Sequence, residues 1–291
     1  MTEFLKELEN KKRIIEEYME KDLSEGGLSY NTVISAMKYS LSAGGKRIRP
    51  ILMMSTYLLF KEDVSNILPF AAAIEYIHTY SLIHDDLPSM DNDDLRRGMP
   101  TCHKKYTEAM AILAGDGLLN YAFEKMLDCE IPHSREAAKY IAGASGKDGM
   151  IGGQVIDIEN ENKIIPLELL NELHSLKTGA LIKAACAVGA ILGGGSEEDI
   201  ESLAKLGALI GMAFQIRDDM LDKISDNETL GKPVGSDEKN NKTTYLTYFS
   251  LSECDEKICE LTLQAEKILD TFGERGEFLK KLIRYLSSRN K

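Results

Sequence analysis

Two clusters of aspartates are the residues of this chain whose type and spacing could do chemistry. The clusters are Asp85-Asp86-Leu-Pro-Ser-Met-Asp91 and Asp218-Asp219-Met-Leu-Asp222. Carboxylates this close together repel one another, and they resist burial unless a positive charge joins them. Oxygen ligands favour a hard divalent cation, Mg²⁺ or Mn²⁺. Because Mg²⁺ held by a few carboxylates keeps positions for phosphate oxygens, the clusters predict metal-assisted chemistry on a phosphate or diphosphate.

The second cluster fits one face of a helix, because Asp218, Asp219 and Asp222 are three and four residues apart. The first cluster needs a change of direction, since six residues separate its ends. Pro88 disfavours helix at the residue before it, so we expect a helix end there that returns Asp91 toward Asp85. Either cluster alone could be a solvated acidic helix end.

Basic residues occur in two groups, one after a pair of glycines and one after the first aspartate cluster. The segment Gly44–Pro50 reads GGKRIRP, and Arg96 and Arg97 come shortly after Asp91. Arginine suits bidentate contact with diphosphate oxygens, and lysine acts as a point charge. The alternative for the first segment is an ordinary solvated helix start; it is not a Walker A loop, because that pattern is missing.

The elements that must position these groups are helices. The chain has 291 residues, of which 43% are hydrophobic and 28% charged, a globular balance with enough apolar material for a large core. Apolar residues recur at helical spacing in several segments, and no segment alternates like a strand. The segments are Phe4–Leu23, Leu68–Leu87, Ala109–Leu127, Leu167–Leu192, Ile200–Leu221 and Ile258–Leu269. We expect an all-α fold, one helical bundle domain over residues 1–291 with a central active-site cavity.

Charge and cysteine content limit the class of protein. The net charge of −12 and the lack of a basic stripe argue against nucleic-acid binding. The five cysteines include no C-x-x-C pair, which favours reduced thiols in a cytoplasmic protein. The apolar run Ala180–Gly195 is interrupted and short, so we expect no integral membrane segment.

Taken together, the motifs resemble those of the trans-isoprenyl diphosphate synthases, or polyprenyl synthetases, and most closely the bacterial farnesyl diphosphate synthases. Six features match in family order over almost the whole chain. They are GGKRIRP (44–50), Glu75-x-x-His78, the first aspartate motif with its LRRG tail (85–98), Lys177-Thr178-Gly179, Phe214-Gln215 with the second aspartate motif, and Gly231-Lys232.

This resemblance implies roles for individual residues. Asp85, Asp91 and Asp218 would hold a group of about three Mg²⁺ ions, with Mn²⁺ as a possible substitute. Three further aspartates would support them through water or other residues: Asp86, Asp219 and Asp222. The allylic diphosphate, dimethylallyl or geranyl, would contact Arg96, Lys177 and Lys232. Isopentenyl diphosphate would be held by Lys46, Arg49, His78 and Arg97. The developing positive charge would face Thr178 and Gln215.

The resemblance also predicts the product and the assembly. Tyr80 and Ser81 lie one turn before Asp85, and a bulky side chain there would stop the growing tail at the C15 product, farnesyl diphosphate. A C20 geranylgeranyl product is the alternative if another layer of the core sets the floor. A terpene cyclase, a non-catalytic partner subunit and a metal phosphohydrolase using His84 are less favoured. We expect a homodimer, and the polar stretch 226–242 is either a surface loop or a lid.

Overall fold

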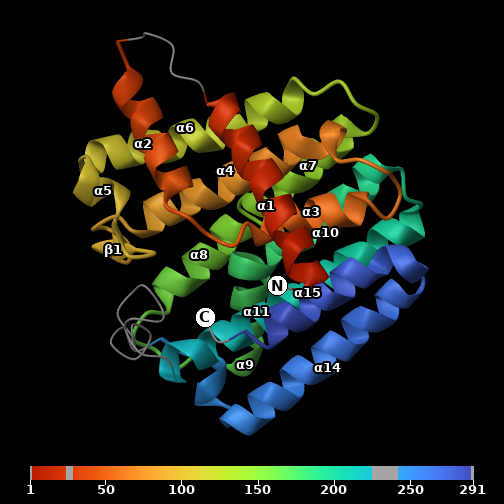
Figure 1. Cartoon of the computed structure of the whole chain (residues 1–291). Coiled ribbons are helices and arrows are strands. Elements are labelled where there is room, and N and C mark those ends of the chain that lie inside the picture. The colour runs from red at the N-terminus through yellow and green to blue at the C-terminus, as the bar shows by residue number, and fades with distance from the viewer. Residues whose placement is uncertain (1, 24–28, 225–241, 290–291) are drawn as a thin grey trace.

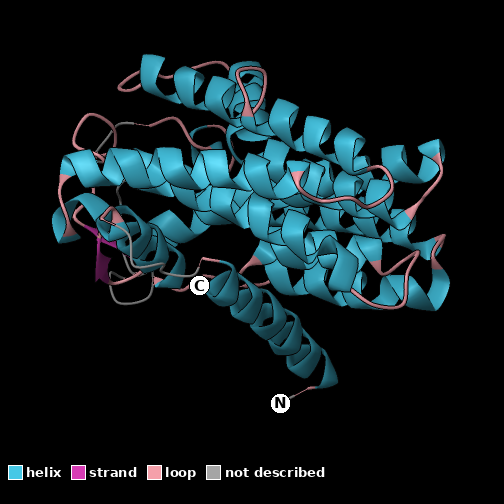
Figure 2. Ribbon diagram, turned by 90° about the horizontal axis from the view of Figure 1, so that it is seen from above, coloured by secondary structure: helices cyan, strands magenta, loops and turns pink. Residues whose placement is uncertain are grey.

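The computed structural model describes residues 2–23, 29–224 and 242–289. Helices account for nearly all of its regular structure (Figure 2). The helices are α1 (Glu3–Asp22), α2 (Asn31–Ser42), α3 (Ile48–Tyr57), α4 (Leu68–Asp85), α5 (Cys102–Lys105), α6 (Glu108–Leu127), α7 (Ser134–Ser145), α8 (Met150–Glu159), α9 (Leu167–His174), α10 (Ala180–Gly193), α11 (Glu197–Ile224), α14 (Leu251–Asp270) and α15 (Glu277–Ser287). The all-α fold class expected from the periodicity is confirmed.

Local sequence sets where several helices begin and end. Thr107 caps α6 by accepting a hydrogen bond from the backbone of Met110 (3.2 Å). Ser250 and Glu253 form a reciprocal capping box at the start of α14. Helix α10 ends at Gly194, whose φ of 79° is left-handed and therefore favours glycine. The start of α6 and the end of α10 agree with the predicted segments, whereas α14 begins seven residues before the predicted Ile258.

Helix α4 is the centre of the core. Its residues from Phe70 to Ile77 are all buried, which explains why its apolar residues surround the helix instead of forming one stripe. Helix α4 packs against α3 and α6, and α10 packs against α3, α7 and α11. Figure 1 shows α14 and α15 lying beside α11 at the outer side of this arrangement.

A small β-hairpin departs from the expectation that the chain lacks strands. Leu95–Arg96 (β1) pairs antiparallel with Met99–Pro100 (β2). The two residues between them, Arg97 and Gly98, both have positive φ, 55° and 78°. This is the backbone that tight two-residue hairpin turns require. The segment is too short to show strand periodicity, so its sequence gave no signal.

The helix around α10 extends beyond the apolar run Ala180–Gly195, as the predicted segment Leu167–Leu192 indicates. A π-helical turn joins α9 to α10, so helix continues over Leu167–Gly193, long and apolar enough to cross a membrane by length and composition alone. However, 72% of its most apolar window is buried inside the protein. It therefore has the burial of a core helix.

The packing of α10 on α3 depends on a glycine. A Cβ at Gly189 would lie 1.9 Å from Thr56 Oγ1 and 2.5 Å from the carbonyl oxygen of Met53. Gly189→Ala should therefore lower the free energy of unfolding by about 1–3 kcal/mol, measured by urea denaturation. Gly143→Ala is the control, because this exposed helical glycine has open space around its Cβ position. The control should gain about 0.5–1 kcal/mol. Equal effects of the two substitutions would contradict the close packing.

Candidate active site

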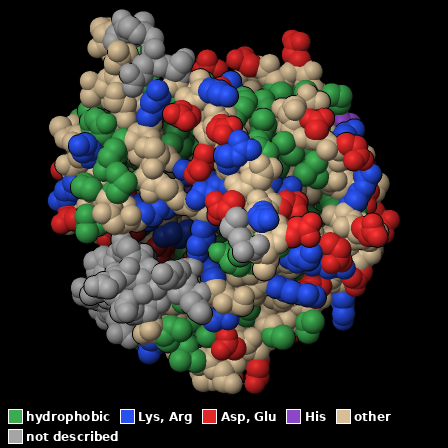
Figure 3. Space-filling view, viewed as in Figure 1, with side chains coloured by type: hydrophobic (Ala, Val, Ile, Leu, Met, Phe, Trp, Pro, Cys, Tyr) green, Lys and Arg blue, Asp and Glu red, His purple; other side chains and the backbone are tan. Residues whose placement is uncertain are grey.

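An apolar cavity of about 490 Å³ lies among α4, α6, α8 and the π-helical turn. Its wall combines apolar residues with members of the predicted site. The predicted members are Arg49, His78, Tyr80, Ser81, Asp85, Lys177 and Thr178. Lys and Arg side chains gather in and around a hollow on the face shown in Figure 3, in the region of α8 in Figure 1. The cavity can therefore hold an apolar chain while charged groups hold its polar end.

The first aspartate cluster sits where α4 ends. The chain folds back so that the amide of Asp91 donates to the carbonyl oxygen of Asp85 (2.9 Å), which confirms the predicted return. The Asp85 carboxylate accepts from Gln154 Nε2 on α8 (2.6 Å). Burial raises the pKa of Asp85 to about 6, against the lowering effect of Lys177. Lys177 therefore offsets part of the desolvation, and any further positive charge would favour the ionised carboxylate.

Asp86 holds an arginine. It is buried, and it accepts from two nitrogens of Arg96: Nε at 2.7 and 2.9 Å from its two oxygens, and Nη2 at 2.5 Å from Oδ1. The hairpin β1–β2 brings Arg96 to this position. The supporting role expected for Asp86 thus has a specific form, since a bidentate pair fixes the plane of the guanidinium.

A lysine outside the predicted site connects the first aspartate cluster to α8. Lys242 Nζ lies 3.4 Å from Asp91 Oδ1 and 3.0 Å from Asp157 Oδ2. Asp157 also pairs with Lys177 (2.5 Å). Although burial opposes it, the two lysines hold the pKa of Asp157 below its ordinary value. Asp157 therefore stays charged and paired.

Lys177 and Thr178 lie in a π-helical turn, Ser175–Gly179, inserted between α9 and α10. Such turns often mark functional sites, because they redirect side chains within a helix. Two glycines let neighbouring helices approach this turn. A Cβ at Gly153 of α8 would lie 2.3 Å from the backbone nitrogen of Lys177. A Cβ at Gly211 of α11 would lie 2.9 Å from the Cα of Gly179. The turn is thus fixed between α8 and α11.

A hydrogen-bond chain orients Thr178 and Gln215. Thr178 Oγ1 donates to Gln215 Oε1 (2.7 Å), and Gln215 Nε2 donates to Asp219 Oδ1 (2.9 Å). The other Asp219 oxygen accepts from the backbone amide of Tyr245 (2.8 Å). Since the threonine proton is engaged, the hydroxyl oxygen keeps a lone pair for a positive centre in the cavity.

Asp218 is paired with the C-terminal end of the described chain. Arg289 donates to Asp218 and to the carbonyl oxygen of Phe214 (3.3 Å), and its guanidinium lies 3.8 Å from the Phe214 ring centroid. Lys46 is electrostatically close to both Asp218 and Arg289. Partial desolvation and Arg289 lower the pKa of Lys46 to about 8.

The four residues expected to hold isopentenyl diphosphate form one basic region. Burial lowers the pKa of Arg49 to about 10, and Arg97 adds to the effect. Burial, followed by the charges of Arg49, Arg97 and Arg96, holds the pKa of His78 well below its ordinary value. His78 is therefore neutral at pH 7 and can offer a hydrogen bond but no charge.

The three aspartates expected to bind metal have the right chemistry for a hard cation, but their carboxylates do not surround a common point. Among the described residues, no group of three acidic, histidine or cysteine side chains is placed to hold a metal ion as it stands. Asp85, Asp91 and Asp218 instead contact Gln154, Lys242 and Arg289. All three offer carboxylate oxygens, the ligands that Mg²⁺ prefers, and two of them already have cationic partners.

Some expectations lie outside the described residues or were incomplete. Lys232 and most of the stretch 226–242 fall outside the described part of the chain. Asp222 is buried on α11. Sequence reasoning missed Gln154, Asp157 and Arg289. Gly152-Gly153 before Gln154 was a usable signal, because paired glycines on a helix indicate a close approach.

Tyr80 forms part of the cavity wall below Asp85. Its side chain is 5% exposed, and its ring meets the His84 ring edge-on at 5.7 Å. The Tyr80 hydroxyl is buried without a hydrogen-bond partner in the described part of the chain. Ser81 also lines the cavity and donates to the carbonyl oxygen of His78 (2.9 Å).

Comparison with known proteins agrees with this site. Residues 31–284 match the family model "Polyprenyl synthetase". The farnesyl diphosphate synthase of Geobacillus stearothermophilus is 51% identical over 228 residues, 77% of each chain. The geranylgeranyl diphosphate synthase of Cyanophora paradoxa is 41% identical over 288 residues, 97% of this chain and 95% of that one.

A solved structure extends the likeness to the whole fold. The geranyltransferase from Helicobacter pylori, described as complexed with magnesium and isoprenyl diphosphate, is 32% identical, with a TM-score of 0.86 over 98% of this chain and 97% of the other. The chain belongs to the polyprenyl synthetase family. The expected enzyme class, a trans-prenyltransferase, is thereby confirmed.

Thr178→Val tests the hydrogen-bond chain, because it removes the hydroxyl and keeps the shape. The kcat for prenyl transfer should fall about tenfold to a hundredfold, since Gln215 loses its donor and the cavity loses an oxygen. Thr178→Ser should retain most of the wild-type kcat in the same steady-state assay. A Thr178→Val enzyme with wild-type kcat would show that the hydroxyl has no part in the reaction.

Proposed function

We propose that this chain condenses isopentenyl diphosphate with dimethylallyl or geranyl diphosphate to give farnesyl diphosphate, with Mg²⁺ as cofactor. The observation that carries the proposal is one apolar cavity lined by Tyr80, Asp85 and Thr178, whose hydroxyl is linked through Gln215 to Asp219 of the second aspartate cluster. The names of the bacterial relatives support the C15 product.

The metal and the allylic substrate share the acidic side of the site. Asp85, Asp91 and Asp218 would hold about three Mg²⁺ ions, or Mn²⁺ in their place. When bound, the metal supplies positive charge that stabilises the leaving diphosphate. Arg96 and Lys177 contact the same diphosphate, and Lys232 joins them. Asp86 and Asp157 keep Arg96 and Lys177 in place.

The second substrate binds to the basic side. Lys46, Arg49 and Arg97 supply charge, and neutral His78 supplies a hydrogen bond to the diphosphate of isopentenyl diphosphate. This binding holds the double bond close to the allylic carbon, which makes the reaction effectively intramolecular. None of these four residues is an expected metal ligand, so the two diphosphates are recognised by separate means.

The chemical step needs no nucleophilic side chain. The allylic C–O bond breaks and its electron pair leaves with the diphosphate. The double bond of isopentenyl diphosphate then forms the new C–C bond, and the departed diphosphate accepts the proton that is lost. Thr178 and Gln215 face the developing positive charge. The apolar walls from α4, α6 and α8 exclude water that would capture the cation.

A C20 geranylgeranyl product is the second candidate, since a relative with that name covers nearly the whole chain. Tyr80 favours C15, because its ring is packed in the wall that a longer tail would have to cross. The two candidates differ only in where the cavity ends.

The proposal also includes the location and assembly of the enzyme. Each chain would form one domain, and two chains would form a homodimer in the cytoplasm. Exposed apolar residues support the homodimer: Ile112 and Leu113 on α6, and Ile151, Val155 and Ile158 on α8. The three on α8 also contribute to or border the cavity, so a second copy that covered this face would shield the substrate tail. Light scattering should give twice the 32.4 kDa chain mass; a monomer at working concentration would contradict this.

The experiment that tests the function is product analysis with isopentenyl and geranyl diphosphates. Wild type should give a C15 alcohol after dephosphorylation, and EDTA should abolish it. Tyr80→Ala should give longer products, because it removes the ring that blocks the tail. Tyr80→Phe is the matched control and should keep the C15 product, since it retains the ring. C15 alone from an active Tyr80→Ala enzyme would remove Tyr80 as the floor, and no metal-dependent elongation by wild type would overturn the function.

A further inference from the structure

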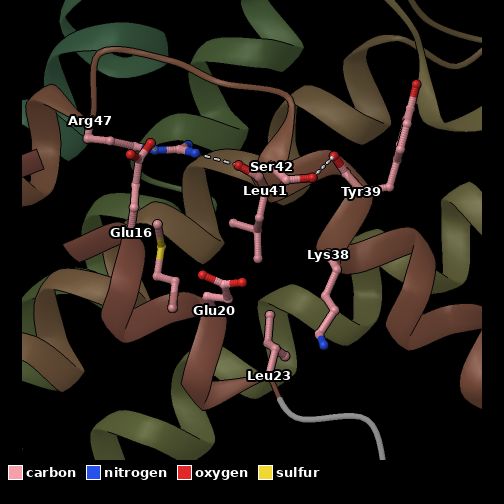
Figure 4. Close-up of a pocket in the computed structure, with 9 residues that line it drawn as sticks. Glu16, Glu20, Leu23, Lys38, Tyr39, Leu41, Ser42 and Arg47 are labelled. Carbon is pink, nitrogen blue, oxygen red and sulfur yellow. Dashed lines mark hydrogen bonds and ion pairs between the residues drawn. The ribbon is translucent and has the colours of Figure 1, made fainter. Parts of the chain in front are cut away.

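Neighbouring arginines of the Gly44–Pro50 segment face different cavities. Arg49 lines the substrate cavity beside His78. Arg47 lines a second cavity, of about 480 Å³, between α1 and α2. Figure 4 shows Arg47 reaching from the loop toward Leu41 and Glu16, among residues from these two helices. Arg47 therefore belongs to the motif but cannot contact the substrates as Lys46 and Arg49 would.

The backbone of this loop needs an external anchor. Three of its residues have left-handed φ values: Gly44 at 85°, Gly45 at 128° and Arg47 at 51°. The last is costly for a residue with a side chain, and such conformations persist only where the surroundings impose them. The loop also receives Arg97, which donates to the Gly44 carbonyl oxygen and would clash with a Cβ at Gly45 at 2.5 Å.

Arg47 supplies that anchor through a buried ion pair. Its Nη1 lies 2.8 Å from Glu75 Oε1, and the two side chains are only 3% and 2% exposed. Its Nε donates to Glu16 on α1 (3.1 Å), and its Nη2 donates to the carbonyl oxygen of Leu41 at the end of α2. One side chain thus joins the loop to α1, α2 and α4.

Glu75 connects the anchor to the basic region. It stands three residues before His78 on α4, so both lie on the same side of that helix. Its charge acts on Arg49 and Arg97 as well as on Arg47. Glu75 is therefore the buried negative charge that allows three guanidinium groups to gather where a diphosphate is expected.

We propose that Arg47 and Glu75 are positioning residues for isopentenyl diphosphate: their ion pair holds the loop so that Lys46 and Arg49 meet the diphosphate, while neither residue touches it. This inference rests on the proposed function. Within the Gly44–Pro50 segment, Lys46 and Arg49 would then bind the substrate, and Arg47 would hold them in position. Among the described residues, the hydrogen bonds of Arg47 go to Glu16, Glu75 and Leu41 and to no aspartate of either cluster, so its loss should weaken isopentenyl diphosphate binding more than allylic binding.

The test compares Arg47→Lys, Arg47→Gln and Glu75→Gln with wild type in steady-state kinetics. For Arg47→Gln and Glu75→Gln, the KM for isopentenyl diphosphate should rise about tenfold to a hundredfold, because the binding groups are displaced, while the KM for geranyl diphosphate changes less than about twofold. Arg47→Lys keeps the charge and should recover part of the loss. A purely structural role would not separate the two KM values.

Arg13→Gln is the matched control. Arg13 also forms an arginine–glutamate pair, with Glu17 on α1 at 2.7 Å, but both side chains are exposed, 60% and 49%. This variant should keep both KM values. Equal increases in both KM values for the Arg47 and Glu75 variants, or a lower kcat with unchanged KM, would overturn the inference.

Calorimetry separates this inference from the proposed function. Isopentenyl diphosphate is titrated in EDTA, because its expected contacts include no metal ligand. Weaker binding to Glu75→Gln than to wild type supports the anchor even if wild type forms no product, and that absence would count against the proposed function alone. Equal binding overturns the anchor. If the Arg47 variants do not fold, Glu75→Gln and Glu75→Asp carry the same comparison.

Discussion

Closely spaced carboxylates cannot stay ionised in a partly buried site unless positive charge accompanies them. The rest of this structure follows from that constraint. Asp86 has Arg96, Asp91 and Asp157 have Lys242, and Asp218 has Arg289. These partners come from the hairpin after α4, the segment before α14 and the end of the described chain. The chain itself therefore supplies positive charge that bound metal ions would otherwise supply.

The helical framework turns this charge balance into a site for two diphosphates. The π-helical turn places Lys177 and Thr178 side by side, and Gly153 and Gly211 let α8 and α11 close on it. On the other side, the residues expected to bind isopentenyl diphosphate come from the loop before α3, from α3 and α4, and from the hairpin turn: Lys46, Arg49, His78 and Arg97. Between them lies the apolar cavity, so the reacting carbons meet where water is scarce.

Much of the fold could be predicted from sequence because helical periodicity is a local signal. The end of α4 and the return of Asp91 followed from Pro88 and from a spacing that no straight helix can align. The carboxylates, lysines and arginines of the motifs were identified by type and order. Where each of them binds substrate stays a prediction, including the roles of Lys46, Arg49 and His78.

The remaining features depend on contacts between distant residues, which periodicity does not encode. Arg289 and Asp218 are 71 residues apart, and Lys242 and Asp91 are 151 apart. The π-helical turn interrupts a helix that runs on through α9 and α10, and helical periodicity does not distinguish a π turn from an α turn. The Arg97 turn is too short for a strand signal. The sequence assigned no role to Arg47, because its pairing with Glu75 joins residues 28 positions apart.

The most direct measurement is a calorimetric titration of the wild-type protein with Mg²⁺ alone, with inorganic pyrophosphate alone, and with each in the presence of the other. Because lysine and arginine already balance the carboxylates, Mg²⁺ alone should bind weakly, and pyrophosphate should strengthen its binding. By linkage, Mg²⁺ should strengthen pyrophosphate binding by the same factor. Binding of Mg²⁺ with equal affinity whether or not pyrophosphate is present would contradict the claim that lysine and arginine side chains neutralise the carboxylates before metal binds.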